Sequence, residues 1–263
     1  MEEWLNLKEK KAIVTGGSSG IGAAIVKELC ELGAKVTNAD LNEGEFQHEN
    51  LLFVKTDVSS RDSVENVVTQ TLEKFERVDC LINNAGINMP ALLVDPKGRH
   101  EINDNLFEKM ISVNLQGIYL MSQQVSKHFV NQGAGVIINM SSESGLEGSE
   151  GQSIYASTKA AVNSLTRSWS KELGKHGIRV VGLAPGIMEE TGLRTLAYEE
   201  SLAYTRSLTV DELREGYSKT STIPLGRSGK LTEVADAVAY LISNRASYIS
   251  GVTINIAGGK TRG

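Results

Sequence analysis

The sequence predicts an α/β fold in which one parallel sheet carries helices on both faces. Short apolar runs alternate regularly with longer amphipathic segments along the 263 residues, and no repeat or Pro/Ser-rich linker divides them. Several runs are continuously apolar and β-branched, which is typical of parallel strands that are buried on both faces. Strand–helix alternation with right-handed crossovers produces a doubly wound sheet. We therefore expect a single doubly wound domain over residues 1–263, with about seven strands.

The expected elements follow one another in a regular order. The strands are residues 12–15, 35–40, 51–56, 80–83, 135–140, 179–184 and 252–256, and the helices are residues 21–32, 63–75, 106–131, 155–175 and 232–243. Only about ten residues separate Asp40 from Leu51, which is too short for a full crossover helix, so we expect an abbreviated connection. A long polar stretch, residues 187–222, follows the sixth strand. Because ligands bind at the carboxyl edge of a parallel sheet, this stretch is expected to be a substrate lid.

The composition excludes several classes of protein. The 27 Lys and Arg residues and 32 Asp and Glu residues give a net charge of −5 without a basic block, which argues against nucleic acid and membrane surfaces as partners. The apolar runs are far shorter than a membrane span of ~20 residues, and the polar start MEEWLNLKEK does not resemble a signal peptide. Cys30 and Cys80 have no Cys or His partner at metal-ligand spacing. We expect a cytoplasmic protein without a metal site.

A glycine-rich turn, TGGSSGIG, follows the first strand and opens the first helix. Such a turn offers unpaired helix N–H groups to a pyrophosphate, and Asp40 ends the second strand 18 residues after Gly22. A carboxylate there accepts hydrogen bonds from ribose hydroxyls and repels a 2′-phosphate, and no cation stands nearby at Leu41. The pattern favours NAD over NADP; the alternatives are a purely structural turn and a strand-end aspartate. The expected cofactor-binding residues of this region are Gly16, Ser18, Ser19, Gly20, Ile21, Gly22 and Asp40.

Tyr155 and Lys159 are spaced i, i+4 on a predicted helix, so they project from one face. A lysine ammonium one turn away, beside a positive nicotinamide ring, favours the phenolate and lowers the pKa of the tyrosine, which can then exchange a proton with an alcohol or carbonyl. Alone, this spacing is common at helix surfaces. Ser141 and Ser142 add weight to it, because they end the fifth strand at the carboxyl edge of the sheet, where a hydroxyl can bond the reacting oxygen.

The combined motifs resemble those of the short-chain dehydrogenase/reductase superfamily, which has the Rossmann fold: TGGSSGIG, Asp57-Val58, NNAG, Asn114, Ser142, YASTK and Pro185-Gly186. The resemblance implies a catalytic tetrad formed by Asn114, Ser142, Tyr155 and Lys159, with Ser141 structural. It also implies cofactor contacts from Asp57, Val58, Asn84, Ala85, Gly86, Tyr155, Lys159, Pro185, Gly186 and Met188. In the superfamily, the residue at Asn114 opens the helix and holds a proton-relaying water; from sequence alone, a surface amide fits equally.

One position departs from the superfamily pattern. Relatives usually place a threonine four residues after the Pro-Gly turn, where it meets the cofactor. Here Thr191 stands one place later, after Ile187-Met188 and two glutamates. Its contact with the cofactor is therefore left open, as is the shape of the first part of the lid.

Further runs resemble one branch of the superfamily, which uses NAD to oxidise D-sorbitol 6-phosphate at C2 to D-fructose 6-phosphate: SSESGLEGSEGQ, TRSWSKELGKHGIRVVG, LREGY and NIAGGKTRG. A phosphate ester needs cations, preferably arginine. The candidates are Arg194, Arg206, Lys260 and Arg262, with Glu143 and Glu147 as acceptors for polyol hydroxyls, and ordinary solvated side chains are the alternative for each. The alternative functions are dehydrogenation of another polar substrate, such as a free sugar alcohol or a hydroxyketone, and a non-catalytic NAD-binding scaffold or sensor. The resemblance also implies a homotetramer.

Overall fold

Seven parallel strands form the centre of the molecule in the computed structural model, which describes residues 4–189, 191 and 194–260. The strands are β1 (Lys11–Thr15), β2 (Lys35–Asp40), β3 (Leu51–Lys55), β4 (Cys80–Asn83), β5 (Gly135–Met140), β6 (Ile178–Pro185) and β7 (Thr253–Ile256). Their order across the sheet is β3-β2-β1-β4-β5-β6-β7, and every neighbouring pair is parallel. The predicted parallel sheet is confirmed, and each predicted strand is present with small differences at its ends.

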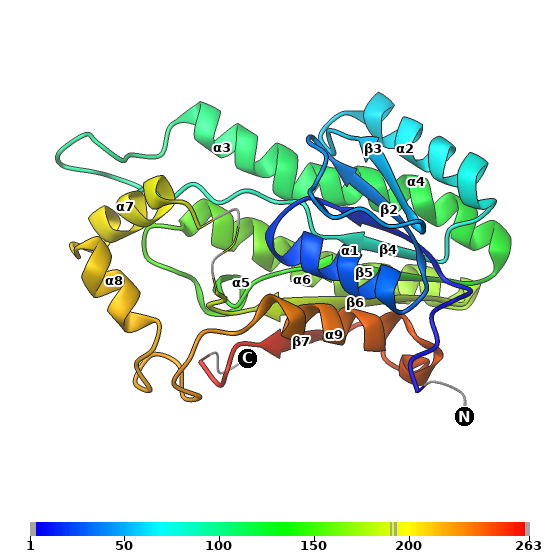
Figure 1. Cartoon of the computed structure of the whole chain (residues 1–263). Helices are drawn as coiled ribbons and strands as arrows, with labels where there is room; N and C mark the ends of the chain where they lie inside the picture. Colours follow the sequence, from blue (N-terminus) through cyan, green and yellow to red (C-terminus); the bar gives the residue numbers. More distant parts are fainter. Residues whose placement is uncertain (1–3, 190, 192–193, 261–263) are drawn as a thin grey trace.

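Two layers of helices cover the sheet. The helices α1 (Gly20–Glu31) and α9 (Leu231–Ile242) pack together on one face, and α2 (Arg61–Phe75), α4 (Gly117–Gln132) and α6 (Ser153–Leu173) cover the other (Figure 1). The alternation of side chains along β1 builds both interfaces: Ala12 and Val14 belong to the core under α1 and α9, whereas Ile13 belongs to the core under α2 and α4. Residues 41–50 contain no helix, as their length predicts.

The helix expected over residues 106–131 is interrupted. It consists of α3 (Asp104–Ile111), a π-helical turn over Ser112–Gln116, and α4. Periodicity could not show this, because a π turn inserts one residue without ending the apolar pattern. Asn114 is fully buried inside the widened turn, which excludes the surface-amide interpretation.

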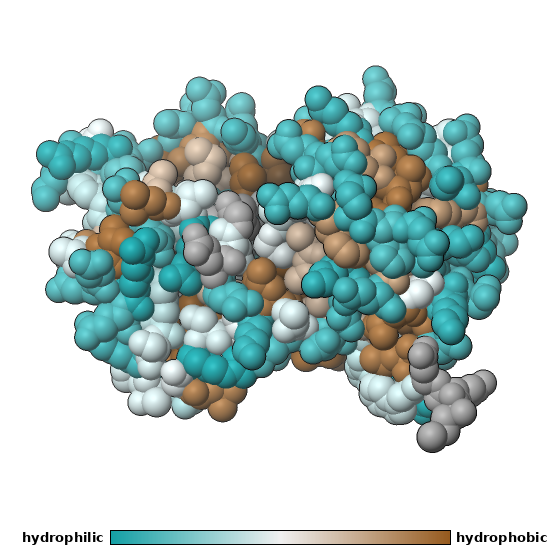
Figure 2. Space-filling model, viewed as in Figure 1, coloured by the Kyte–Doolittle hydropathy of each residue, from teal (hydrophilic) through white to brown (hydrophobic). Residues whose placement is uncertain are grey.

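The segment that follows β6 folds into two further helices, α7 (Leu196–Thr205) and α8 (Val210–Gly216), which its polar composition did not predict. They enclose a small apolar core of their own, formed by Leu202, Ala203 and Leu213. Figure 1 shows both helices beyond the carboxyl ends of the strands. Figure 2, in the same view, shows mostly hydrophilic side chains on the surface of the molecule. Within the described residues, no helix is long and apolar enough to cross a membrane.

Candidate active site

A cavity of about 710 Å³ opens at the carboxyl ends of the strands, between the glycine-rich turn and the helices α7 and α8. Its volume is in the range of small-molecule and cofactor sites. Most of the residues singled out from the sequence line it: Gly16, Ser19, Gly20, Ile21, Gly22, Asp40, Asp57, Val58, Asn84, Ala85, Gly86, Ser142, Glu143, Glu147, Tyr155, Lys159, Pro185, Gly186, Met188, Arg194, Arg206 and Lys260. Ser18 and Asn114 do not line it, and Arg262 lies outside the described residues. Thr191, whose role was left open, also lines the cavity.

The glycine-rich turn leaves a bare helix N-terminus at the cavity wall. The backbone of Gly16 has φ +65°, and a Cβ there would lie 2.9 Å from the Cα of Ala85, so only glycine fits without strain. The Asn84 side-chain amide donates to the carbonyl oxygens of Thr15 and Gly16, at 3.0 Å each, and fixes the turn. At the start of α1, the Ser19 side chain forms no capping hydrogen bond, and the first turn carries no acidic residue. The positive end of this helix dipole therefore faces the cavity without compensation.

Asp40 lies beside this turn and holds part of it. Its Oδ2 accepts a hydrogen bond from the backbone N–H of Ser18 at 3.0 Å, and its Oδ1 accepts one from Asn42 N–H at 3.3 Å. The Ser18 hydroxyl bonds the Asn42 carbonyl and accepts from the Asn38 amide, so it turns away from the cavity. Both the backbone N–H and the hydroxyl of Ser18 are therefore used within the turn and its neighbours, and its predicted contact with the cofactor stays a prediction.

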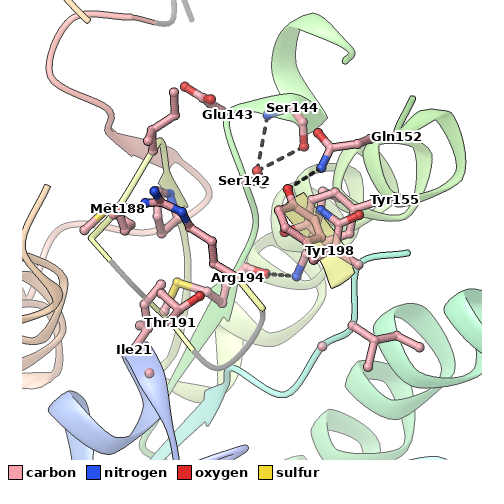
Figure 3. A pocket seen from close by; sticks show the side chains of 18 of the residues that line it. Ile21, Ser142, Glu143, Ser144, Gln152, Tyr155, Met188, Thr191, Arg194 and Tyr198 are labelled. Atoms are coloured by element: carbon pink, nitrogen blue, oxygen red, sulfur yellow. Dashed lines mark hydrogen bonds between the residues drawn. The ribbon is translucent and has the colours of Figure 1, made fainter. Parts of the chain in front are cut away.

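Ser142, Tyr155 and Lys159 line the same cavity, although the first follows β5 and the other two belong to α6. Figure 3 shows the part of the cavity around Ser142 and Tyr155. The Ser142 hydroxyl accepts hydrogen bonds from the Ser144 hydroxyl at 3.0 Å and from the Ser144 backbone N–H at 3.3 Å, which orients its own proton outward. Lys159 Nζ lies 5.6 Å from the centre of the Tyr155 ring and donates to the Met140 carbonyl at 2.7 Å. The expected grouping of these side chains is present in the structure.

Burial determines the proton affinities of this group. It raises the pKa of Tyr155 to about 12, while the hydrogen bond with Ser142 lowers that pKa and the charge of Glu143 raises it. Burial also lowers the pKa of Lys159 to about 8. The sequence argument expected Lys159 and a positive nicotinamide ring together to lower the pKa of Tyr155, and this stays a prediction for the cofactor-bound site. In the structure, loss of hydration outweighs every favourable contact, so the phenol holds its proton strongly in the unliganded chain.

Asn114 does not line the cavity, but it binds the backbone of Ile87, which does. Its Oδ1 accepts from Ile87 N–H and its Nδ2 donates to the Ile87 carbonyl, both at 2.8 Å, and Nδ2 also contacts Thr158 Oγ1 at 3.3 Å. A Cβ on Gly86 would lie 3.3 Å from Asn114 Oδ1 and 3.5 Å from Lys159 Nζ. Asn114 thus fixes the chain after β4 directly beside the lysine.

Three of the six charged substrate-binding candidates pair with one another. Lys260 Nζ lies 2.7 Å from Glu143 Oε1 and 3.2 Å from Glu147 Oε1. The structure therefore places a phosphate candidate and both polyol candidates in one ion-pair cluster, which the sequence did not predict because more than a hundred residues separate them. Arg194 forms an ion pair with Glu199 at 2.9 Å, and its guanidinium lies 4.1 Å from the centre of the Tyr217 ring.

Sequence reasoning missed a polar wall next to Tyr155. Gln152 Nε2 donates to Tyr198 OH at 2.8 Å (Figure 3). Gln152 Oε1 accepts from the Ser149 hydroxyl at 2.6 Å, and all three residues line the cavity. The position of Gln152, three residues before Tyr155 at the start of one helix, could have indicated that the two share a face. No local pattern could have placed Tyr198, because α7 reaches this wall only through the tertiary fold.

The comparison with protein families agrees with this geometry. Residues 10–201 match the family model described as short chain dehydrogenase, so the chain belongs to the short-chain dehydrogenase family. The predicted Rossmann-type fold and the predicted enzyme class, a dehydrogenase, are thereby confirmed.

One relative and two solved structures are similar to this chain over nearly its whole length. A protein of Klebsiella pneumoniae named sorbitol-6-phosphate 2-dehydrogenase is 60% identical over 268 residues, which cover 100% of both chains. The crystal structure of a 3-ketoacyl-(acyl-carrier-protein) reductase from Brucella melitensis, complexed with NADH, is 31% identical with a TM-score of 0.81, and the match covers 97% of this chain and 99% of that one. The aldohexose dehydrogenase of Thermoplasma acidophilum, in ligand-free form, is 26% identical with a TM-score of 0.84 and coverages of 98% and 96%.

Proposed function

We propose that this chain uses NAD to oxidise D-sorbitol 6-phosphate at C2 to D-fructose 6-phosphate, reversibly. The observation that carries the chemistry is the convergence of Ser142, Tyr155 and Lys159 on one cavity wall. The substrate is inferred from the full-length 60% identity to the Klebsiella protein of that name. The polar wall beside Tyr155, formed by Ser149, Gln152 and Tyr198, supports a polyol over an apolar substrate, because it offers donors and acceptors to several hydroxyls.

The residues along the cavity fit a dinucleotide. The uncapped N-terminus of α1 suits a pyrophosphate, since its N–H groups and dipole attract negative charge. Asp40 fits ribose hydroxyls, and within the described lining no cation stands beside it to receive a 2′-phosphate, which favours NAD over NADP. The other proposed cofactor contacts are Asp57, Val58, Ala85, Gly86, Pro185, Gly186 and Met188, which line the same cavity.

In the proposed reaction Tyr155 takes the proton of the C2 hydroxyl, while the C2 hydrogen leaves with its electron pair. NAD, when bound, supplies the acceptor for that hydride. Ser142 donates a hydrogen bond to the reacting oxygen, because it accepts both of its contacts from Ser144 and these do not use its own proton. A pKa of about 12 keeps Tyr155 protonated at neutral pH even with Lys159 beside it, so further positive charge next to the phenol is needed in the loaded site to favour the phenolate. Asn114 positions the Ile87 segment next to that lysine.

The test is to follow NADH absorbance with D-sorbitol 6-phosphate and NAD, in parallel with unphosphorylated sorbitol and with NADP. Turnover that requires both the phosphate and NAD would support the proposal. Turnover of free sorbitol or of a hydroxyketone, but not of the phosphate, would refute the substrate and keep the chemistry. NAD binding without turnover of any polyol would favour a scaffold or sensor. Homotetrameric assembly and a cytoplasmic location stay predictions, which sedimentation and cell fractionation can test.

A further inference from the structure

One arginine of the cavity wall differs from the other charged candidates. Arg206 is half-buried at the carboxyl end of α7, and within the described part of the chain no carboxylate forms an ion pair with it. Arg194 is paired with Glu199, and Lys260 is paired with Glu143 and Glu147. A half-buried guanidinium without a counter-ion is costly, because its charge has lost part of its hydration.

The neighbours of Arg206 orient it but leave its charge uncompensated. Its Nη2 donates to the Ser149 hydroxyl at 2.9 Å, and its Nε donates weakly to the Glu150 carbonyl at 3.4 Å. Both acceptors are neutral, and Nη1 donates to none of the described residues. Arginine presents its donors in a planar fork that matches the oxygens of a phosphate, so this group is held ready for an anion.

A continuous line of polar side chains connects Arg206 to the reacting end of the cavity. Ser149, which accepts from Arg206, donates to Gln152 at 2.6 Å, and Gln152 donates to Tyr198 at 2.8 Å. Tyr198 lines the same cavity as Tyr155 and Arg206, and it lies close enough to Arg206 for the guanidinium charge to act on its hydroxyl. A ligand that extends from Tyr155 along this wall therefore meets hydroxyl and amide groups first and a guanidinium at its far end.

We propose that Arg206 binds the phosphate of the substrate and that Gln152 and Tyr198 bind the hydroxyls between C2 and that phosphate. The inference rests on the proposed function, and it assigns to Arg206 the discrimination between a polyol phosphate and the free polyol. The phosphate of sorbitol 6-phosphate lies at the far end of the carbon chain from C2, and Arg206 ends the row of hydrogen bonds that runs from Tyr198 through Gln152 and Ser149.

The main test compares Arg206→Gln with the wild type. The ratio of kcat/KM for D-sorbitol 6-phosphate to kcat/KM for sorbitol is expected to fall by tens-fold, mainly through KM for the phosphate. Arg206→Lys is expected to recover part of the loss, since it keeps the charge but not the fork. Lys219→Gln is the matched control: it removes one positive charge from the same segment, at an exposed residue paired with Glu215, and should leave the ratio unchanged.

A purely structural role for Arg206 would reduce both activities equally, and that result would overturn the inference. A loss of discrimination in Lys109→Gln instead, at the exposed lysine that lines the cavity from α3, would also overturn it. If free sorbitol is not turned over, inhibition by inorganic phosphate decides, because its inhibition constant must rise in Arg206→Gln and stay constant in Lys219→Gln. If the wild type does not turn over sorbitol 6-phosphate but inorganic phosphate inhibits it through Arg206, the proposed substrate is refuted and the anion site at Arg206 is supported.

Discussion

Replacement of Asp40 by asparagine tests the choice of cofactor most directly. Asp40 Oδ2 accepts from Ser18 N–H at 3.0 Å, and asparagine retains one carbonyl oxygen that can keep this bond. The change therefore removes the negative charge with little effect on the glycine-rich turn. A net hydrogen bond to a charged group contributes about 1.5–3 kcal/mol, which corresponds to about a 10- to 150-fold change in affinity. We expect Kd for NAD to rise by at least about tenfold, at the lower end of this range.

The same variant should bind NADP no worse than the wild type does, because the repulsion between the Asp40 carboxylate and a 2′-phosphate is gone. Calorimetric titration of both cofactors into wild type, Asp40→Asn and Glu43→Gln measures the effect. Glu43 is the matched control, since it is an exposed carboxylate three residues away that lies outside the cavity lining. Equal Kd values for NAD in all three proteins would refute the assignment of Asp40 to the ribose.

Three further predictions follow from buried groups. Tyr155→Phe should abolish NADH formation while Kd for NAD stays within about twofold of the wild type, and residual turnover would identify another proton acceptor. Burial lowers the pKa of Lys159 from 10.5 to about 8, so at a pH between these two pKa values the unfolded chain binds more protons than the folded chain. Urea unfolding should then show stability rising by up to about 1.4 kcal/mol per pH unit in wild type, relative to Lys159→Met, and a constant difference would contradict the burial argument. Glu199 is 3% exposed and receives hydrogen bonds from Arg194 and Arg214, which outweigh the effect of burial and lower its pKa. Glu199→Gln should lower the free energy of unfolding by about 1–3 kcal/mol and increase proteolysis within residues 194–217. The wild type should lose the same contribution as pH falls below the ordinary pKa of a glutamate. Unchanged proteolysis in Glu199→Gln would refute this role.

The role of Glu199 also explains how the helices α7 and α8 are held together. Arg194, which follows β6, and Arg214, on α8, both bond this carboxylate on α7. The Arg194 guanidinium additionally donates to the Met188 carbonyl at 3.1 Å, so the same cluster reaches back to the cavity wall. Tyr204, also on α7, donates a hydrogen bond to Asp95 in the segment before α3. The backbone N–H of His100 holds the pKa of Asp95 well below its usual range, and the Tyr204 hydroxyl contributes to the same effect. Glu199 therefore joins α7 to α8, and Tyr204 joins α7 to the segment before α3.

The sequence by itself determined the framework and the residues that we propose as the reacting groups. Strands and helices differ in side-chain period, so apolar patterns within ten to twenty residues were sufficient to find all seven strands and the helices that cover the sheet. The glycine-rich turn is local for the same reason, since the conformation of Gly16 depends on its own backbone freedom. The i, i+4 spacing of Tyr155 and Lys159 put both on one helix face. Resemblance to relatives then selected Ser142 over Ser141, whose hydroxyl bonds the Lys159 carbonyl in the structure.

Only the tertiary structure decided which charges remain available to a ligand. The pairing of Lys260 with Glu143 joins positions 117 residues apart, and Tyr198 meets Gln152 across 46 residues. Such contacts depend on how two elements pack, and the strength of an ion pair or the pKa of a buried phenol depends on hydration that packing removes. For this reason four cations near the lid looked equivalent in the sequence, whereas among the described ones the fold neutralised Arg194 and Lys260 and left Arg206 facing the cavity without a carboxylate.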